Sequence, residues 1–528
     1  MTDQRPTTLL LISGITGFLL GSFQHGTWQL AVESSQVIAG LVPYSPDNPF
    51  YLYHTKAWTL LHQIPGIFLR LGFSERMLSF GMSGLLGMLS FQTLSLFAWI
   101  LCRNLFLAFA CPFFALFTHA HSYFAIYPVW LMGTSNSQGA ISTFFILLTA
   151  ALLAAQRYRA GFILLGVAPA VHLSLGFLCW LIATMCFLWS SDARRSEARS
   201  NMTFLVIGAA LGLTSIMFHL LFTYRFSEHS VTADASSYLH TFVRSWDSHR
   251  APVPFRRFGF FLNVILLIIG LLSTAKFAKF LNENAIFLLR ASVAAASLGL
   301  VFAVLSWLPL ETMPSALIIM MPARILEWNV VILPALIIGL LGRTLIASRS
   351  LRIASHLLLA FMAFGCILFP DRFRPDPNEW RRFNLFDHTD DAMWKRLADG
   401  KGVLLTGSDL HLIQLRTRRP VLLDGGQMDL LPYTLEAAAS IDRILSAVYC
   451  IDLRNPPAES IRTATIRGPL NRQCWETRSA IEWTELAKHF HFTEVLTYQD
   501  WKLNLPQMER TQNLTLYEVA AASTHDSP

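Results

Sequence analysis

The chain has 528 residues, of which 53% are hydrophobic and only 14% are charged, with a formal net charge of +7. Soluble proteins carry about 25% charged residues, so this composition argues against a soluble enzyme and indicates a membrane protein. Membrane proteins place an excess of Lys and Arg on their cytoplasmic side. That bias explains the positive charge, and we expect no nucleic-acid partner.

Apolar segments fill residues 1–370, and a bilayer span needs about 20 such residues. The predicted spans, about eleven in all, are 7–22, 78–101, 104–119, 137–156, 160–172, 174–190, 201–222, 257–275, 285–310, 315–341 and 351–369. The first lacks a small-residue cleavage site, so we predict an uncleaved helix. The pair 160–172 and 174–190 consists of short segments, and a single long helix is the alternative.

Basic residues fall at alternate connections between these segments. Placing them inside puts the N-terminus in the cytoplasm, and an odd number of spans then puts residues 371–528 in a bacterial periplasm. An even number would place that region inside but leave one basic connection outside. The outer connections, 23–77, 120–136 and 223–256, are long, and long ordered loops tend to carry function.

The first outer loop contains two carboxylates, Glu33 and Asp47. A carboxylate at a membrane surface can act as a general base toward an acceptor hydroxyl, or hold a divalent cation beside a phosphate. The alternative is structural, with Glu33 solvating a surface helix and Asp47 beginning a turn. His25, at the start of this loop, is a candidate substrate-binding residue.

The second outer loop is both polar and aromatic. Tyr123, Tyr127 and Trp130 suit stacking on a sugar ring, and Asn136 supplies hydrogen bonds. Aromatic residues also belong at any membrane interface, so the sequence leaves both interpretations open.

Ionisable residues in or beside apolar segments are costly and therefore suggest a site. His172 lies between the two short segments, and Arg225 flanks the third outer loop. Arg324 and Glu327 are neighbours on one helical face. They either satisfy one another, or Arg324 binds a lipid-linked phosphate, for which guanidinium geometry is suited. We predict substrate-binding roles for these residues.

Residues 371–528 predict a compact α/β domain. Strands are expected at 402–406, 420–424 and 493–497, with helices near 409–416, 436–449 and 479–490. Asp424-Gly425-Gly426 follows the second strand, where an open α/β sheet often binds a ligand. Nucleotide-binding and zinc motifs are missing from the sequence, so a domain that only covers the outer face is the alternative.

The seven cysteines divide between the two regions. Those in or beside apolar segments behave as small hydrophobic residues; they are Cys102, Cys111, Cys179, Cys186 and Cys366. Cys450 and Cys474 lie in the C-terminal domain and would pair if that domain faces an oxidising compartment.

The layout resembles the GT-C class of membrane glycosyltransferases. The similar elements are the long first outer loop with its carboxylates, the Gly133–Gly139 stretch, the connection at His172, and a trailing periplasmic domain. The resemblance implies a polytopic helical bundle that transfers a sugar from a polyprenyl-phosphate donor to a glycan, lipid or protein acceptor at the periplasmic face. An acidic residue of the first outer loop then serves as base or metal ligand.

By position, Glu33 or Asp47 takes that role, and a divalent cation (Mg or Mn) is the cofactor the class allows. The sequence departs from the class in lacking its closely spaced acidic pair. Two other functions remain open: a transporter that moves a lipid-linked glycan unchanged, and a non-catalytic scaffold of a polysaccharide assembly complex.

Overall fold

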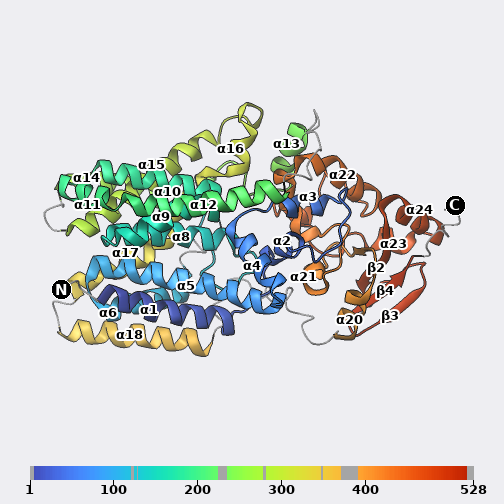
Figure 1. Ribbon diagram of the computed structural model, residues 1–528, viewed down its shortest axis with the longest axis horizontal. Helices are drawn as coiled ribbons and strands as arrows, with labels where there is room; N and C mark the ends of the chain where they lie inside the picture. The colour runs from blue at the N-terminus through green and yellow to red at the C-terminus, as the bar shows by residue number, and fades with distance from the viewer. Residues whose placement is uncertain are drawn as a thin grey trace.

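The computed structural model describes residues 5–119, 124–127, 129–223, 235–276, 281–345, 349–369 and 391–519. A long helical bundle carries a smaller unit of helices and strands at one end, while the N-terminus lies near the other end (Figure 1). The last bundle helix and the first helix of the smaller unit lie on either side of the predicted boundary at residue 370.

Every predicted apolar segment coincides with helical structure. The bundle contains α1 (Arg5–Leu19), η1 (Leu20–Gln24), α5 (Glu75–Cys102), α6 (Leu105–Thr118), α8 (Gln138–Ala154), α9 (Tyr158–Val171), α10 (Leu173–Leu188), α11 (Asp192–Ser200), α12 (Met202–Thr223), α14 (Phe258–Lys276), α15 (Glu283–Leu305), α16 (Ser315–Met320), η5 (Pro322–Leu326), α17 (Glu327–Leu345) and α18 (Arg349–Leu368). Of the predicted pair, α9 and α10 are separate helices that meet at His172.

Within the described residues, five helical stretches are long and apolar enough to cross a membrane. They are Arg5–Gln24, Glu75–Cys102, Met202–Leu221, Glu283–Leu305 and Ser315–Gly339. Six further apolar helices are shorter, which suits helices buried by neighbours in a bundle. The protein is therefore mostly helical with several membrane-length segments, and the full number of spans stays a prediction.

The predicted span 315–341 is not one continuous helix. Met321 adopts a left-handed conformation with φ of 46°, and a short 3-10 segment, η5, separates α16 from α17. Pro322 explains the break, because proline lacks an N–H and disfavours helical backbone in the residue before it. The break places Arg324 on η5 and Glu327 at the first position of α17.

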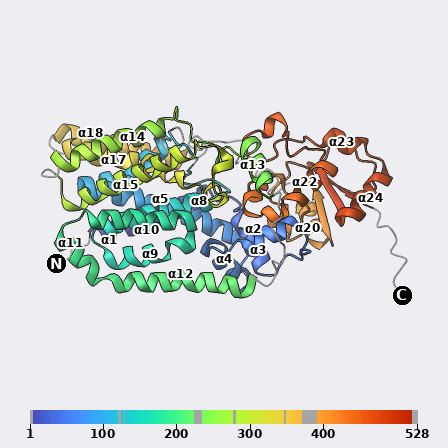
Figure 2. The same cartoon turned by 90° about the horizontal axis from the view of Figure 1, so that it is seen from above.

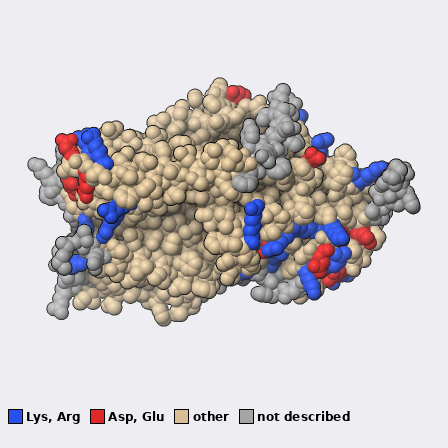
Figure 3. Space-filling model, viewed as in Figure 1, with Lys and Arg blue, Asp and Glu red and all other residues tan. Residues whose placement is uncertain are grey.

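The surface of the bundle is suited to lipid. In the face shown in Figure 3, charged residues gather toward the two ends of the molecule and a broad uncharged surface separates them. Helices α12 and α18 run along its outside (Figures 1 and 2) and expose large apolar side chains such as Val206, Leu213 and Phe361. An exposed apolar band bounded by charge is the pattern expected of a membrane-spanning bundle.

The C-terminal unit contains a four-stranded mixed sheet in the order β1-β2-β4-β3. Its elements are α20 (Asp391–Asp399), β1 (Val403–Thr406), α21 (Ile413–Thr417), η7 (Gly425–Tyr433), η8 (Leu435–Ala437), α22 (Ala438–Ala447), η9 (Ala458–Ser460), α23 (Arg472–Thr477), α24 (Ala480–Phe490), β2 (Phe492–Tyr498), β3 (Gln507–Arg510) and β4 (Leu514–Glu518). β1 and β2 are parallel, whereas β4 is antiparallel to both β2 and β3. The predictions at 402–406 and 493–497 are confirmed as strands.

The third predicted strand, 420–424, is wrong, because it forms only an isolated bridge between Val421 and Leu404. Side chains of the first outer loop form hydrogen bonds with the backbone N–H and carbonyl of Val421 instead. Tyr44 Oη accepts its N–H at 3.3 Å, and Asn48 Nδ2 donates to its carbonyl at 3.1 Å. The segment predicted as a strand therefore forms part of the contact between the first outer loop and the C-terminal unit.

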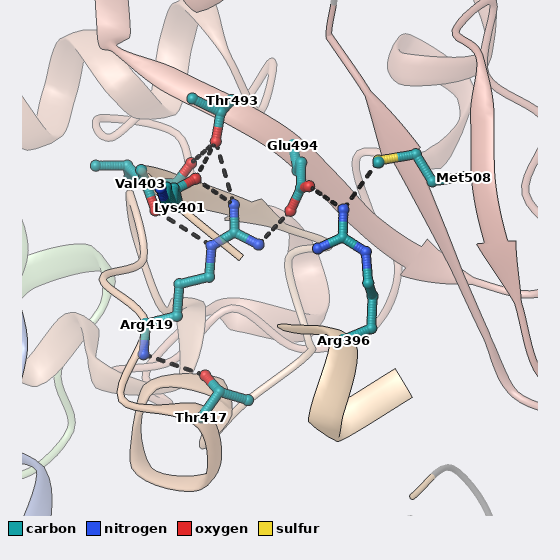
Figure 4. A network of polar contacts seen from close by, with 9 residues as sticks. Arg396, Lys401, Val403, Thr417, Arg419, Thr493, Glu494 and Met508 are labelled. Atoms are coloured by element: carbon teal, nitrogen blue, oxygen red, sulfur yellow. Dashed lines mark hydrogen bonds and ion pairs between the residues drawn. The ribbon is translucent and has the colours of Figure 1, made fainter. Parts of the chain in front are cut away.

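A buried ion-pair network fixes the edge of this sheet (Figure 4). Arg419 pairs with Glu494 of β2 and also donates to the carbonyls of Lys401 and Gly402, at 2.9 and 3.2 Å. Arg396 of α20 reaches the second oxygen of Glu494 at 3.1 Å. The network ties α20, the entry to β1 and β2 together, and we assign it a structural role.

Described parts of the first and third outer loops pack into the C-terminal unit. The first contributes α2 (Ala31–Ile38), α3 (Pro49–Lys56) and α4 (Leu60–Arg70), and the third contributes α13 (Ala235–Ser245). Phe50 and Trp246 are buried in the same apolar cluster as Trp475 and Trp483 of the C-terminal unit. The indole of Trp246 also donates to the Leu453 carbonyl at 2.7 Å. The loops and the unit therefore share one core, at the end of the bundle where the outer face was predicted.

Candidate functional site

The first and second outer loops are joined by one buried glutamine. The side-chain amide of Gln29 donates to the Thr134 carbonyl at 2.8 Å and to Ser83 Oγ at 2.9 Å, and its oxygen accepts from Ser137 at 2.5 Å. His25 is buried beside this junction, where its ring lies against Gly133, whereas the Asn136 side chain is exposed. The predicted residues His25 and Asn136 thus belong to one loop junction.

Glu33 lies in α2 with only 1% of its surface exposed. Gln427 of the C-terminal unit donates to Oε2, and Oε1 has no hydrogen-bond partner among the described residues. Burial, followed by the nearby charge of Asp424, raises the pKa of Glu33 well above its usual value. Glu33 is therefore an enclosed side chain between the loop and the domain, where burial favours its protonated form, and it is out of reach of a bulky acceptor in this arrangement.

The Asp424-Gly425-Gly426 turn stabilises the start of η7. Asp424 accepts the N–H of Gly426 at 2.8 Å and contacts Nδ1 of His411 at 2.6 Å. Burial opposes ionisation of Asp424, but the charge and hydrogen bond of His411 outweigh it and lower the pKa of Asp424. The predicted ligand turn thus caps η7 and presents a charge to Glu33.

Asp47, the second predicted base, lies in a different environment from Glu33. It is exposed on the turn that precedes α3, whose first N–H groups are capped by Asn48. The structure therefore does not bring Glu33 and Asp47 together.

Arg324 lies on η5, half-buried at the end of the bundle that carries the C-terminal unit. Within the described chain its Nε is buried without a hydrogen-bond partner, and Arg324 forms no ion pair. The guanidinium lies against Gly139 in the first turn of α8, where any added Cβ would collide with it. A buried guanidinium atom without a partner is costly, which makes this cation a candidate anion ligand.

Glu327, three residues after Arg324, bonds to the second outer loop. Its Oε1 accepts the backbone N–H groups of Ile126 and Tyr127, at 2.6 and 2.8 Å. Arg324 and Glu327 thus form no direct ion pair in the described chain, although each lies within electrostatic range of the other. The second outer loop uses only Oε1 of Glu327, and Oε2 is buried without a hydrogen-bond partner among the described residues.

A second arginine, Arg250, faces the same region from the third outer loop. It pairs with the buried Asp247, and its guanidinium carbon lies 4.9 Å from the ring centroid of Tyr433. Burial opposes ionisation of Asp247, but hydrogen bonds and the charges of His249 and Arg250 lower its pKa to about 2. Arg324 lies within electrostatic range of Tyr433, Glu327 and Arg250.

Aromatic residues and one more carboxylate complete the cluster. Tyr433 is 42% exposed, and its ring centroid lies 6.4 Å from that of Tyr53. Asp429, four residues before Tyr433 on η7, is half-buried and within electrostatic range of Arg250 and Tyr53. Burial raises the pKa of Asp429, while the charge of Arg250 opposes the increase.

The remaining predicted residues fall into two groups. Tyr127 is buried within electrostatic range of Arg324, and so is His172, which caps α10 by accepting the Leu175 N–H at 3.5 Å. Tyr123 and Arg225 lie outside the described residues. The structure thus brings Arg324, Glu327, Tyr127 and His172 together, and Tyr53 links this cluster to Glu33. We name Arg324, Arg250, Tyr127, Tyr433 and Asp429 the junction cluster.

Sequence reasoning missed three members of the junction cluster. Arg250 is one of several basic residues in the predicted outer loops, and its sequence context does not set it apart from the others. Asp429 and Tyr433 follow the Asp424-Gly425-Gly426 turn, where the sequence analysis selected only Asp424. The sequence feature that could have identified Asp429 and Tyr433 is their position shortly after that turn. Among the described residues, no group of three or more His, Cys, Asp or Glu is placed to hold a metal ion.

Fold and cluster together define a mostly helical protein with membrane-length helices and a polar cluster where the bundle meets a small α/β unit. Neither a protein-family model nor a curated protein matches the sequence.

Proposed function

We propose that the protein is a membrane glycosyltransferase that uses a polyprenyl-phosphate-linked sugar in the synthesis of a cell-envelope glycan or exopolysaccharide. The observation that carries the proposal is Arg324, a half-buried cation whose Nε is buried without a hydrogen-bond partner in the described chain, within electrostatic range of Tyr127 and Tyr433. A guanidinium suits phosphate oxygens. The faces of tyrosine rings suit the apolar faces of a sugar.

The position of the cluster favours a lipid-linked substrate. Arg324 lies within the membrane-length stretch Ser315–Gly339, whereas Tyr433 belongs to the C-terminal unit. A polyprenyl phosphate has the same division, with a hydrocarbon tail in the bilayer and a charged head at its surface. A substrate held there extends its sugar toward the C-terminal unit and its lipid along the bundle.

Cellular placement belongs to the same proposal. We place the protein in a bacterial inner membrane, with the N-terminus in the cytoplasm and the C-terminal unit in the periplasm. The disulfide between Cys450 and Cys474 supports an oxidising compartment for that unit. Positive charge at alternate connections supports the orientation.

The other predicted roles belong to the same proposal. Asp47 is the exposed carboxylate of the first outer loop and could bind Mg or Mn beside a phosphate together with substrate oxygens. His172, His25 and Asn136 would shape the substrate site from the bundle side. Transport of an unchanged glycan and scaffolding remain the competing functions, and the experiment below separates them from transfer.

The test has a binding arm and a cellular arm. Full-length protein in nanodiscs is titrated with farnesyl phosphate, with farnesol as the uncharged control. Arg324→Ala is expected to weaken binding of farnesyl phosphate about 10- to 100-fold, since a hydrogen bond to a charged group contributes about 1.5–3 kcal/mol. Arg257→Ala, which removes an exposed arginine at the same end of the bundle, is the matched control.

In the cellular arm, a deletion strain is complemented with the same variants and its envelope glycans are profiled. Loss of the glycan in Arg324→Ala at normal membrane level supports the proposal. Equal binding of farnesyl phosphate by Arg324→Ala and wild type overturns it. Loss of transport with a completed lipid-linked glycan accumulating on the cytoplasmic side would instead identify a transporter.

A further inference from the structure

Helix α4 of the first outer loop is apolar on two faces. One face, with Leu61, Pro65 and Leu69 at intervals of four residues, is buried and packs mainly against α2. The other face is exposed, although it consists of large apolar side chains spaced three or four residues apart on the helix. A helix on a water-exposed loop normally carries polar residues on its outer face, so the second apolar face of α4 calls for a partner.

The exposed face continues beyond the end of the helix, because the ring of Phe73 packs edge-on against Phe68 with centroids 5.1 Å apart. Between 38% and 68% of the surface of each of its side chains is exposed. We call these residues the α4 face; they are Ile64, Ile67, Phe68, Leu71 and Phe73.

Two hydrogen bonds hold α4 against α12, a membrane-length helix that is largely unburied. The side-chain amide of Gln63 donates to the Ser215 carbonyl at 3.0 Å, and Ser215 Oγ donates to the Gln63 side-chain oxygen at 2.6 Å. One helical turn further along α12, the ring of His219 lies 6.2 Å from that of Trp58. The α4 face therefore adjoins a helix that exposes its own apolar side chains along the bundle.

The position of this contact along α12 sets the depth of α4. Ser215 lies six residues before Leu221, the last residue of the described membrane-length stretch of α12. At about 1.5 Å per residue, α4 meets α12 about 9 Å inside the end of that stretch. Helices that lie in the plane of a membrane bury their apolar face about 5–10 Å into the boundary between headgroups and acyl chains. With 11 residues α4 is too short to cross a bilayer, but it lies at the depth of such an interfacial helix.

The residues at the two ends of α4 suit the headgroup region. Trp58 precedes the helix, and the exposed Arg70 is its last residue. Tryptophan is enriched at membrane interfaces, and arginine near the surface is attracted to anionic lipids. Arg70 also donates to the carbonyls of Ile38 and Ala39 at the end of α2, at 2.8 and 3.3 Å, so its guanidinium is held beside the α4 face.

We propose that α4 is an interfacial helix and that the lipid leaflet on the side of the C-terminal unit covers the α4 face. Arg70 then lies at the level of the phospholipid phosphates. Because α2 contacts both Arg70 and the C-terminal unit, where Gln36 donates to the Leu415 carbonyl at 3.0 Å, α4 and α2 together hold that unit at the membrane surface. This inference needs a bundle that spans a membrane, but it is independent of glycosyl transfer.

Spin labels test the environment of the α4 face in the full chain. Ile67→Cys and Leu71→Cys are each labelled with a nitroxide and placed in nanodiscs of phosphatidylethanolamine and phosphatidylglycerol. Wild type carried through the same labelling gives the background, since its five free cysteines are buried. Power saturation compares the access of molecular oxygen, which concentrates in lipid, with that of a water-soluble nickel chelate. Leu213→Cys on α12 is the lipid reference, and Ser446→Cys on α22 is the water reference, because both side chains are exposed.

We expect both α4 labels to be more accessible to oxygen than to the chelate, at about 5–10 Å below the phosphates. Access of the chelate equal to that at Ser446→Cys overturns the proposal, because water would then cover the face. Low access of both reagents also overturns it and shows that protein covers the face, as in a dimer. If either variant fails to accumulate, Ile64→Cys replaces it and is judged by the same criteria. None of these measurements involves farnesyl phosphate, so their failure leaves the proposed glycosyl transfer untouched.

Discussion

Glu327 accepts the backbone N–H of Tyr127 at 2.8 Å, and this contact stands where the sequence predicts an ion pair with Arg324. One oxygen of this carboxylate is bonded to the second outer loop, and Arg324, three residues earlier, forms no direct ion pair within the described chain. A loop contact thus leaves a cation available to a substrate.

The first prediction concerns Glu327. Glu327→Ala leaves the N–H groups of Ile126 and Tyr127 without their acceptor, and an unsatisfied buried group costs about 1–3 kcal/mol. We expect the apparent Tm in detergent, followed by tryptophan fluorescence, to fall by several degrees. Glu311→Ala, at an exposed ion pair with Arg244, should change it little, because exposed pairs contribute about 0–1 kcal/mol. Equal Tm values for the two variants would contradict the role of Glu327.

The second prediction uses the contact between Gly139 and Arg324. A methyl group at Gly139 occupies the space of the Arg324 guanidinium, so Gly139→Ala should displace it and weaken farnesyl phosphate binding at least 10-fold. Gly81→Ala is the matched control, since open space surrounds a Cβ at that helical position. Unchanged binding in both variants would show that the guanidinium position does not matter.

The third prediction follows from the protonation of Glu33. Its pKa is raised in the folded protein, so folding holds a proton that unfolding releases. Stability from this group is therefore present below the unfolded pKa, about 4.3, and declines as pH rises toward the folded pKa. Wild type should lose more apparent Tm than Glu33→Gln between about pH 5 and about pH 8. Parallel pH curves for the two proteins would refute the buried, protonated state.

Asp424 acts in the opposite direction in the same experiment. Its folded pKa is lowered, so its contribution is present above the unfolded pKa and is lost as pH falls. Comparing wild type with Glu33→Gln only above about pH 5 keeps that contribution constant, because the unfolded pKa of Asp is about 3.9.

The fourth prediction concerns the disulfide. Five free cysteines are buried, and Cys450 is bonded to Cys474. After denaturation without reductant, a maleimide of defined mass should label five cysteines, and after reduction all seven. Seven labels without reductant would place the C-terminal unit in a reducing compartment. Cys474→Ser should destabilise that unit by about 2–4 kcal/mol.

The sequence predicts the helices well because a bilayer demands long apolar runs, and such runs are local. The same locality explains its failures. Val421 reads as a buried strand, but Tyr44 and Asn48 occupy its backbone groups from a distance of more than 370 positions. The β3–β4 hairpin was not predicted, since its residues carry only a short alternating pattern between 507 and 518.

The candidate site shows the same limit. Arg324 and His172 could be identified because charge is conspicuous in an apolar segment. Arg250 and Asp429 lie in polar stretches, where charged residues are common, and only the packing of the third outer loop and η7 against the bundle distinguishes them. The burial of Glu33 likewise depends on Gln427, which no local pattern connects to α2.

Phe50 and Trp246, from the first and third outer loops, lie in one core with residues near the end of the chain. In the proposed orientation these loops cross the membrane during synthesis, long before their packing partners have been made. Their apolar side chains cannot complete this core until translation is nearly finished. A stop codon between α18 and α20 should therefore leave the bundle with loops that lack their packing partners. On the proposed localisation, envelope proteases would degrade such a truncated chain, so its last quarter would be needed for the protein to accumulate.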